Sequence, residues 1–372
     1  MRMLRFVNGT VVGRKDQSGL LIAAGRIAQP DAAVAATQFD LDDGFLLPGF
    51  IDTQVNGGGG ILFNDNPTME AIAAIGAAHR RFGSTAFLPT LISDDLDQVD
   101  TAMRAVEQAM DAAVPGVIGI HLEGPFLSET RKGVHDAGKF RRLDGRAIAL
   151  LSSLRVGKTL VTLAPEECES ADITALATAG VIVAAGHSNA TYRQMADAFA
   201  AGVTGVTHLY NAMSPFTHRA PGVVGAALEN RSVYCGIIPD GRHVDPAALR
   251  IAVNARPRDR FMLVTDAMPT VGSVDKSFVL QGKPISVVDG VCVNENGVLA
   301  GSNLDMATAL RNMVRMVGVT LEEASVMASA APAAFLGACG RGVLTPGARA
   351  DLVWLGRDMM VRGVWIEGRR TV

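Results

Sequence analysis

The chain has 372 residues, of which 48% are hydrophobic and 19% are charged, so it can bury a large core and is not a disordered chain. Its 34 Lys and Arg residues nearly balance its 37 Asp and Glu residues, which gives a formal net charge of −3. This balance, without a basic run, excludes the overall positive field that nucleic-acid-binding proteins use, and we expect no nucleic-acid partner.

Short alternating segments separated by turns occupy the first 47 residues, as in MLRFVNGTVV and ATQFDLDDGFLLPG. The same texture returns near the end of the chain, in ADLVWLG and MVRGVWIEGRR. Alternation of apolar and polar residues is typical of half-buried strands. We therefore predict a small β-sandwich domain built from both termini, with residues 1–47 and 337–372.

Between these ends, apolar runs alternate with helical patterns such as TMEAIAAIGAAHRRFG, LDQVDTAMRAVEQAMDAA and TYRQMADAFAAG. The eight apolar runs span residues 50–56, 85–90, 117–124, 160–165, 181–188, 203–211, 234–241 and 261–268. Eight strand–helix units predict an α/β protein with a (β/α)8 TIM-like barrel over residues 48–336. A doubly wound open sheet is the alternative, which the lack of GxGxxG after the first strand weakens.

The cysteines and the apolar stretches bear on the location of the protein. The four cysteines are far apart and form no CxxC motif, so we expect free thiols in the reducing cytoplasm. The opening MRMLRFVNGT is not followed by the apolar core of a signal peptide. The most apolar stretch, residues 175–186, is shorter than the ~20 residues that span a bilayer, so we expect no membrane association.

Polar residues gather at the ends of the predicted strands, where a barrel carries its chemistry. Five of the seven histidines lie at or just after these ends: His121, His135, His187, His208 and His243. Packing alone does not explain this bias. We therefore predict a catalytic site at the carboxyl end of the barrel.

Three of these strand ends can supply metal ligands. His187 and His208 end neighbouring strands, and Glu123 ends another. Two imidazoles and one carboxylate suit a catalytic Zn²⁺ or a similar metal with an open position, and a pair of hydrogen-bonded histidines is the structural alternative. Asp266, at the end of the last strand, can take a proton from water or can instead cap the following segment.

The segment HLYNAMSPFTHRAPG, after the sixth strand, offers groups for an anion. Asn211, the Ala212 amide and Arg219 can hold an anion with N–H groups and a guanidinium, although a lone loop arginine is usually solvated. His243, in the polar turn after the seventh strand, can contact a substrate hydroxyl or a phosphate. No role follows for His218.

Six motifs together resemble one family. HLEGPFLSETRKGVHD, GHSNATY, THLYNAMSPFTHRAPG, PDGRHVD, LVTDAMP and LAGSNL are similar, in this order, to motifs of the bacterial N-acetylglucosamine-6-phosphate deacetylases of the amidohydrolase superfamily. The terminal β unit and LPGFID fit this superfamily too, so the resemblance spans almost the whole chain. It implies metal-dependent hydrolysis of N-acetyl-D-glucosamine 6-phosphate to D-glucosamine 6-phosphate and acetate.

The resemblance also implies roles at the matching positions. Glu123, His187 and His208 would bind the metal. Asp266 would act as general base and then as general acid, and His135 would help to polarise the acetyl carbonyl. Substrate contacts are implied for Val134, His135, Asn211, Ala212, Arg219, His243, Leu299, Ala300 and Gly301. Arg219 is expected to reach into the neighbouring subunit's site, which implies a homodimer.

The first strand departs from the wider superfamily. Many amidohydrolases carry His-x-His at this strand end, where the histidines bind a second metal, but this chain has Gln54 and Asn56 there, in PGFIDTQVNGGGG. Because amides are weak ligands for transition metals, we predict a vacant second-metal position and one divalent metal per subunit. Zn²⁺ suits the remaining ligands best, and Fe²⁺, Mn²⁺ or Co²⁺ are alternatives.

Two other functions stay open. A deacetylase for the N-acetylgalactosamine 6-phosphate epimer is an alternative, because a loop can read one inverted hydroxyl. A catalytically silent sugar-phosphate sensor on the same fold is another. Pyrimidine-type cyclic-amide hydrolases usually carry a lysine that bridges two metals. This function is disfavoured, because no suitable lysine ends a strand in this chain.

Overall fold

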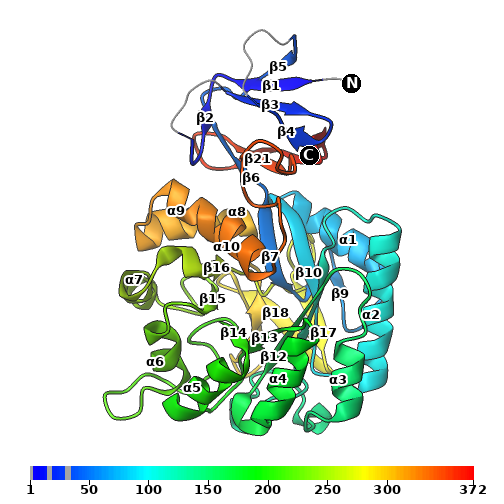
Figure 1. Cartoon of the computed structure of the whole chain (residues 1–372), viewed down its shortest axis with the longest axis vertical. Coiled ribbons are helices and arrows are strands. Elements are labelled where there is room, and N and C mark those ends of the chain that lie inside the picture. Colours follow the sequence, from blue (N-terminus) through cyan, green and yellow to red (C-terminus); the bar gives the residue numbers. More distant parts are fainter. Residues whose placement is uncertain (1–2, 15–18, 30–34) are drawn as a thin grey trace.

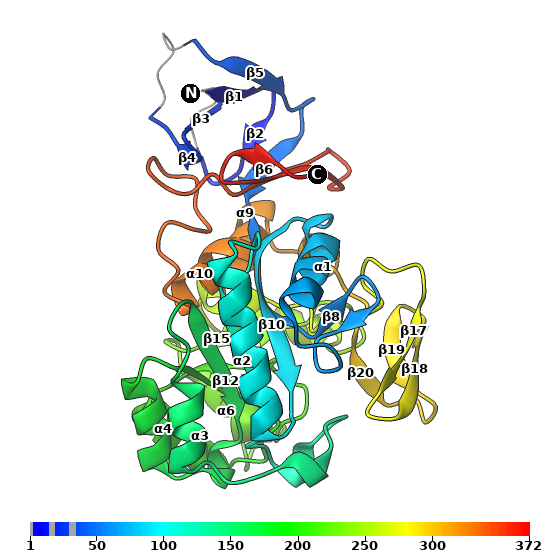
Figure 2. The ribbon, with the colours of Figure 1, turned by 90° about the vertical axis from the view of Figure 1, so that its right-hand side faces the viewer.

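The computed structural model of the protein describes residues 3–14, 19–29 and 35–372. A barrel ringed by helices lies below a smaller sheet domain that contains both ends of the chain (Figure 1). The two terminal segments, far apart in sequence, lie side by side in this smaller domain (Figure 2). The predicted fold class, a TIM-like barrel with a small β-sandwich built from both termini, is confirmed.

The barrel is an eight-stranded parallel sheet, and each strand overlaps one of the predicted apolar runs. Its strands are β7 (Phe50–Val55), β10 (Ser84–Ile92), β11 (Gly119–Glu123), β12 (Lys158–Leu163), β13 (Ile182–Ala185), β14 (Val203–Val206), β15 (Tyr234–Ile237) and β16 (Phe261–Leu263). The ring closes at its carboxyl end, where the Asp266 N–H donates to the Gln54 carbonyl at 3.0 Å and the Asn56 N–H donates to the Ala267 carbonyl at 3.0 Å. This closure places the ends of the first and last strands side by side.

Helices surround this sheet, and three of them, α1, α2 and α5, fall on the predicted helical patterns. The α-helices are α1 (Met69–Arg80), α2 (Leu96–Asp111), α3 (Gly145–Leu151), α4 (Ser170–Thr178), α5 (Tyr192–Ala201), α6 (Gly222–Glu229), α7 (Pro246–Ala255), α8 (Met306–Asn312), α9 (Leu321–Ser325) and α10 (Ala331–Phe335). Short 3-10 turns are η1 (Glu129–Arg131), η2 (Ala137–Lys139), η3 (Pro165–Glu167) and η4 (Arg258–Arg260), and π-helical turns are η5 (Met313–Val317) and η6 (Val326–Ala330). None of the helices in the described ranges is both long and apolar enough to cross a membrane.

The small domain packs two sheets face to face. One sheet holds β1 (Leu4–Val7), β3 (Leu20–Ala23), β4 (Arg26–Ile27) and β5 (Thr37–Asp40). The other holds β2 (Thr10–Val11), β6 (Phe45–Pro48), β21 (Leu352–Leu355), β22 (Val361–Ile366) and β23 (Arg369–Arg370). Phe6 from the first sheet meets Trp365 from the second edge to face, with ring centroids 5.0 Å apart, and both side chains are buried. The domain boundaries at residues 47–48 and 336–337 stay a prediction.

An additional antiparallel sheet follows β16 and precedes α8 in the sequence, and it lies against the side of the barrel (Figure 2). It consists of β17 (Ser277–Leu280), β18 (Lys283–Val288), β19 (Val291–Asn294) and β20 (Leu299–Ser302). The Ser302 N–H donates to the Asp266 carbonyl at 2.8 Å, and the Met268 N–H donates to the Ser302 carbonyl at 3.0 Å. This sheet therefore brings the LAGS segment beside the end of the last barrel strand.

The glycines after the first barrel strand allow a close approach of two loops. Gly57 and Gly58 form β8 (Gly57–Gly58), which pairs with β9 (Ile61–Leu62). The Gly57 N–H donates to the Ala267 carbonyl at 2.9 Å, and the buried ring of His79 lies 2.9 Å from the Gly57 carbonyl. A Cβ on Gly58 would lie 2.8 Å from His79 Nε2, closer than real Cβ contacts allow. A Cβ on Gly57 would lie 3.0 Å from the Pro269 nitrogen, so these glycines let the loop approach both α1 and the segment after Asp266.

A buried arginine supports the outer wall of the barrel. Arg256 is 3% exposed, and its guanidinium donates to the carbonyls of Ala227 (2.6 Å) and Val233. We expect Arg256→Met to lower the free energy of unfolding by about 2–4 kcal/mol, because two buried carbonyls lose their donors. Urea unfolding measures this change. Arg250→Met is the control: its guanidinium donates to the Met316 carbonyl from an exposed position, so its loss should cost under about 1 kcal/mol.

Candidate active site

The ends of the barrel strands surround a cavity of ≈ 370 Å³. Its lining includes these predicted site residues: Asn56, Glu123, Val134, His135, His187, His208, Asn211, Ala212, His243, Asp266, Leu299 and Gly301. Apart from Gly301, four of them have positive backbone φ angles: His187 at 48°, His208 at 28°, Ala212 at 48° and Asp266 at 51°. Such angles are uncommon for residues other than glycine, and they cluster at functional sites.

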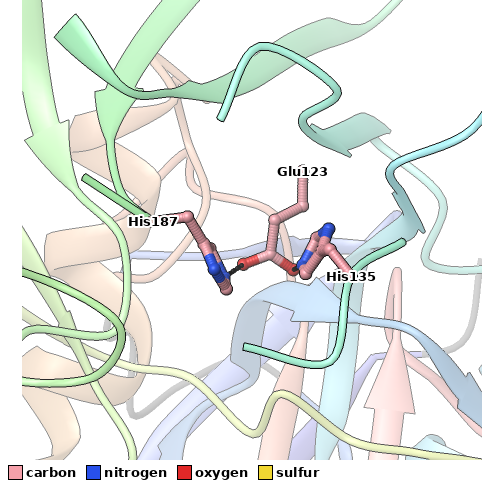
Figure 3. A group of neighbouring side chains, drawn as sticks. All are labelled: Glu123, His135 and His187. Carbon is pink, nitrogen blue, oxygen red and sulfur yellow. Dashed lines mark ion pairs between the residues drawn. The ribbon is translucent and has the colours of Figure 1, made fainter. Parts of the chain in front are cut away.

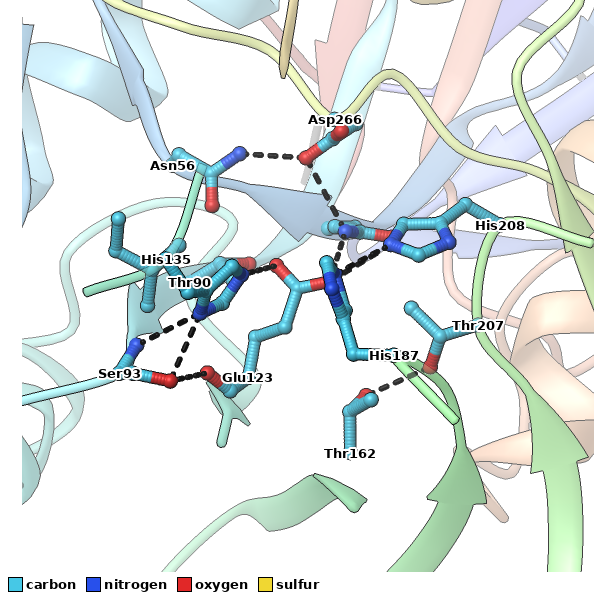
Figure 4. Close-up of polar contacts among 12 residues, drawn as sticks. Asn56, Thr90, Ser93, Glu123, His135, Thr162, His187, Thr207, His208 and Asp266 are labelled. Atoms are coloured by element: carbon cyan, nitrogen blue, oxygen red, sulfur yellow. Dashed lines mark hydrogen bonds and ion pairs between the residues drawn. The ribbon is translucent and has the colours of Figure 1, made fainter. Parts of the chain in front are cut away.

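The tightest group in the cavity joins Glu123, His187 and His208 (Figure 4). Glu123 Oε1 lies 3.0 Å from His208 Nε2 and 3.3 Å from His187 Nε2, and the two Nε2 atoms lie 3.1 Å apart. Ligands at the usual zinc distances, arranged tetrahedrally, are about 3.3 Å from one another. Burial opposes ionisation of Glu123, but its interactions with His187 and His208 outweigh burial and hold the pKa of Glu123 well below its ordinary value.

These three residues fit a divalent cation. His187 Nδ1 lies 2.9 Å from the Arg131 carbonyl, so Nδ1 carries the proton and the lone pair of Nε2 faces the cavity. At 3.1 Å, the two facing Nε2 atoms need a proton or a cation between them, because two lone pairs at this distance repel. The hydrogen-bonded alternative supplies a proton, whereas a metal satisfies both nitrogens and the carboxylate together.

His135 forms a second group with Glu123 and His187, in which one ligand atom from each residue lies within 4.8 Å of the others (Figure 3). Its ring is held by Ser93, whose N–H donates to Nδ1 at 3.3 Å and whose hydroxyl lies 2.8 Å from the same nitrogen. Burial lowers the pKa of His135 to about 3, so the ring is neutral at pH 7. Because an amide N–H can only donate, the proton of the neutral ring is on Nε2. His135 is therefore suited to donate to a carbonyl oxygen, which favours His208 as the third metal ligand.

Asp266 lies beside this group and is held by two side-chain amides. Its Oδ1 accepts hydrogen bonds from Asn56 Nδ2 at 2.7 Å and from Gln54 Nε2 at 3.1 Å. Burial raises the pKa of Asp266 to about 6, and the negative charge of Glu123 acts in the same direction. No helix in the described part of the chain is capped by this side chain, so the capping alternative is not supported. A carboxylate with this pKa is ionised at pH 7 and is matched to proton transfer near neutrality.

The remaining predicted residues differ in their placement. His243 Nδ1 lies 2.6 Å from Asp240 Oδ2, which orients the ring at the cavity wall. Ala300 is fully buried in an apolar cluster with Met268 and does not line the cavity. Arg219 is exposed, within the exposed residues 215–220, and lies outside the cavity of its own chain. His218 lies in the same exposed segment, and no contact assigns it a role.

Three further residues belong to this region. Arg131 lines the cavity, and its Nε donates to Asn189 Oδ1 at 2.9 Å. Ser93, which orients His135, was missed because the predicted second strand stops at residue 90, whereas β10 continues to Ile92. His121 lies deeper in the barrel, 2.8 Å from Thr162 Oγ1, and is not part of the cavity wall.

Comparison with known proteins agrees with this geometry. The amidohydrolase family matches residues 45–371. The chain is 44% identical over 332 residues to the N-acetylgalactosamine-6-phosphate deacetylase of Shewanella sp. (strain ANA-3), covering 89% of this chain and 84% of that protein. The solved N-acetylglucosamine-6-phosphate deacetylase from Pasteurella multocida is 33% identical, with a TM-score of 0.95 over 100% of both chains. A mutant of the Mycobacterium smegmatis deacetylase, in complex with N-acetyl-D-glucosamine-6-phosphate, is 33% identical, with a TM-score of 0.89 over 99% of this chain and 98% of that one. The chain therefore belongs to the amidohydrolase family.

Proposed function

We propose that this protein hydrolyses the N-acetyl group of N-acetyl-D-glucosamine 6-phosphate, giving D-glucosamine 6-phosphate and acetate. The observation that carries the proposal is Asp266, a half-buried carboxylate held beside a set of ligands suited to a metal, in a chain similar to hexosamine-phosphate deacetylases. We propose one divalent cation per subunit, held by Glu123, His187 and His208. Zn²⁺ suits these ligands best, and Fe²⁺, Mn²⁺ or Co²⁺ are alternatives.

The cation, when bound, would lower the pKa of a water molecule and polarise the acetyl carbonyl. Asp266 would accept a proton from the attacking water as the water oxygen bonds to the acetyl carbon. His135 donates its Nε2–H to the acetyl oxygen while negative charge develops there. Asp266 then returns the proton to the departing nitrogen, so the amide and water become an amine and acetic acid, which ionises to acetate.

The acid limb of the pH profile tests the state of Asp266. Because burial raises the pKa of Asp266 to about 6, kcat/KM should be at its plateau above that pH and should fall as the carboxylate is protonated below it. A bound cation stabilises the carboxylate and moves this limb to lower pH. An acid limb with a midpoint above about pH 7 would therefore contradict the assignment. Metal content measured at each pH separates protonation of Asp266 from loss of the metal.

Capture of the sugar phosphate is proposed for Asn211, the Ala212 amide and His243, which all line the cavity. Further contacts with the sugar are proposed for Leu299, Gly301 and Val134. These roles are supported by the position of the three residues in the lining of the cavity. Ala300 contributes through its backbone, because its side chain is buried elsewhere.

A homodimer is proposed because Arg219 lies outside its own cavity on an exposed segment with Phe216, which is 62% exposed. Arg219 would complete the phosphate site of the neighbouring subunit. Mixing Arg219→Gln with Asp266→Asn chains should then restore activity above that of either variant, since one site of a mixed dimer keeps both residues. No gain on mixing, in chains shown to exchange, would argue that each site is complete within its own chain.

The galactosamine epimer remains the second candidate substrate, because the relative with 44% identity is an N-acetylgalactosamine-6-phosphate deacetylase, whereas the two solved glucosamine enzymes are 33% identical. Measuring acetate release and kcat/KM on both 6-phosphates decides between them. A preference of about tenfold or more for the galactosamine epimer would reassign the substrate. Binding without acetate release, in a metal-free protein, would instead identify a sensor. The proposed setting is the cytoplasm, where the four free thiols stay reduced.

A further inference from the structure

We propose that Gln54 and Asn56 form an amide clamp on Oδ1 of Asp266, so that Oδ2 is the oxygen that exchanges the proton during hydrolysis. The clamp rests on the proposed function, because it assigns a position to the base of that reaction. It also gives the two amides at the first strand end a role beyond replacing the ligands of a second metal.

Gln54 joins the base to a metal ligand. Its Nε2 donates to Glu123 Oε1 at 2.9 Å and to Asp266 Oδ1 at 3.1 Å, so both amide hydrogens are directed at carboxylate oxygens. An amide nitrogen carries two hydrogens, whereas each nitrogen of an imidazole carries one at most. A histidine at this position could not donate to both carboxylates from one atom. Gln54 does not line the cavity, so we treat it as a positioning residue that acts through its two partners.

Asn56 holds the same oxygen from the other side. Its Nδ2 donates to Asp266 Oδ1 at 2.7 Å (Figure 4). Oδ1 thus accepts two amide hydrogens, while Oδ2 accepts no hydrogen bond from the residues that the structure describes. Rotation of the carboxylate would break both bonds. The clamp therefore leaves Oδ2 as the oxygen free to meet a water molecule.

The surroundings make these bonds strong. Gln54 is 2% exposed and Asn56 is fully buried, so water does not compete for the amide hydrogens. The backbone reinforces the arrangement, because the Asp266 N–H donates to the Gln54 carbonyl and the Asn56 N–H donates to the Ala267 carbonyl. The closure of the barrel therefore fixes the distance between the clamp and the base.

Gln54→Met and Asn56→Leu test the clamp, since each variant keeps the size of the side chain and removes its donors. We expect kcat for acetate release to fall by about 10- to 100-fold in each, with KM within about threefold of wild type. Asn56 contacts Asp266 and not Glu123, so Asn56→Leu should also keep the metal content of the wild type. Thr90→Val is the control: this buried hydroxyl accepts the Val55 N–H at 2.8 Å and contacts neither carboxylate, so kcat should stay within about threefold.

The outcomes separate the clamp from the proposed function. Wild-type protein that releases no acetate from either hexosamine 6-phosphate would refute the function itself. If the wild-type protein is active and Asn56→Leu keeps a kcat near that of the wild type, the clamp is overturned while the proposed function stands. This holds whatever the result for Gln54→Met. Equal losses of kcat in Thr90→Val and Asn56→Leu would also overturn it, because the effect would then come from any damage to the first strand.

Discussion

Replacing Asp266 with asparagine is expected to lower kcat by about 10²- to 10⁴-fold, the usual contribution of general acid–base catalysis. Asparagine has nearly the same shape, and its Oδ1 can still accept the amides of Gln54 and Asn56. It cannot take up the proton of the attacking water. The protein should therefore fold normally and keep its metal while losing turnover.

Steady-state acetate release, with metal analysis of the same sample, measures this effect. Asp52→Asn is a matched control, since Asp52 is a fully buried carboxylate in the same strand as Gln54. Its Oδ2 accepts the Thr265 hydroxyl at 2.6 Å, and that hydroxyl also lies 3.3 Å from the Gln54 carbonyl, to which it can turn when an amide replaces the carboxylate. Kcat of Asp52→Asn should stay within about tenfold of wild type. An Asp266→Asn enzyme as active as this control would remove Asp266 from the mechanism.

The barrel could be predicted because its strands are buried on both faces and so appear as unbroken apolar runs. All six residues of β7 and all nine of β10 are buried. The sheet of β17–β20 escaped prediction for the opposite reason. In β18, five of six residues are exposed or half-buried, and only Ile285 is buried, so no apolar run marks the strand. A sheet that lies on the surface of a barrel has too short a buried face to be visible in the sequence.

The site could be predicted as a set of strand ends, but not as a set of hydrogen bonds. Parallel strands bring their ends together in any barrel, which is why Glu123, His187, His208 and Asp266 converge. The role of His135 depends on which ring nitrogen carries the proton, and this follows from the backbone N–H of Ser93. The link between Gln54 and two carboxylates likewise depends on atomic distances. The sequence therefore predicts which residues meet, while the proposed roles of ligand, donor and base depend on atomic distances that only the structure supplies.

Removal of the metal is expected to reduce acetate release by about 1,000-fold or more, which corresponds to about 4 kcal/mol of transition-state stabilisation. Dialysis against a chelator followed by titration with Zn²⁺ measures the effect. Activity should return fully at one equivalent per subunit, because the amide nitrogens of Gln54 and Asn56, unlike those of imidazoles, offer no lone pair to a second ion, and their hydrogens are directed at carboxylates. Full activity only at two equivalents would contradict a single metal.

The variants His208→Ala and His135→Ala identify the third ligand. The two histidines differ in whether Nε2 lies close to the other proposed ligand atoms or carries a proton. His208 Nε2 lies 3.0 Å from Glu123 Oε1 and 3.1 Å from His187 Nε2, so its loss should release the metal and the activity together. His135 Nε2 carries a proton and lies 4.0 Å from Glu123 Oε2, so its loss should lower kcat by about 10²- to 10³-fold while one metal stays bound. Loss of metal from His135→Ala with retention in His208→Ala would reverse the two roles. The proton that Ser93 directs onto Nε2 would then have to move to Nδ1, which the Ser93 N–H opposes.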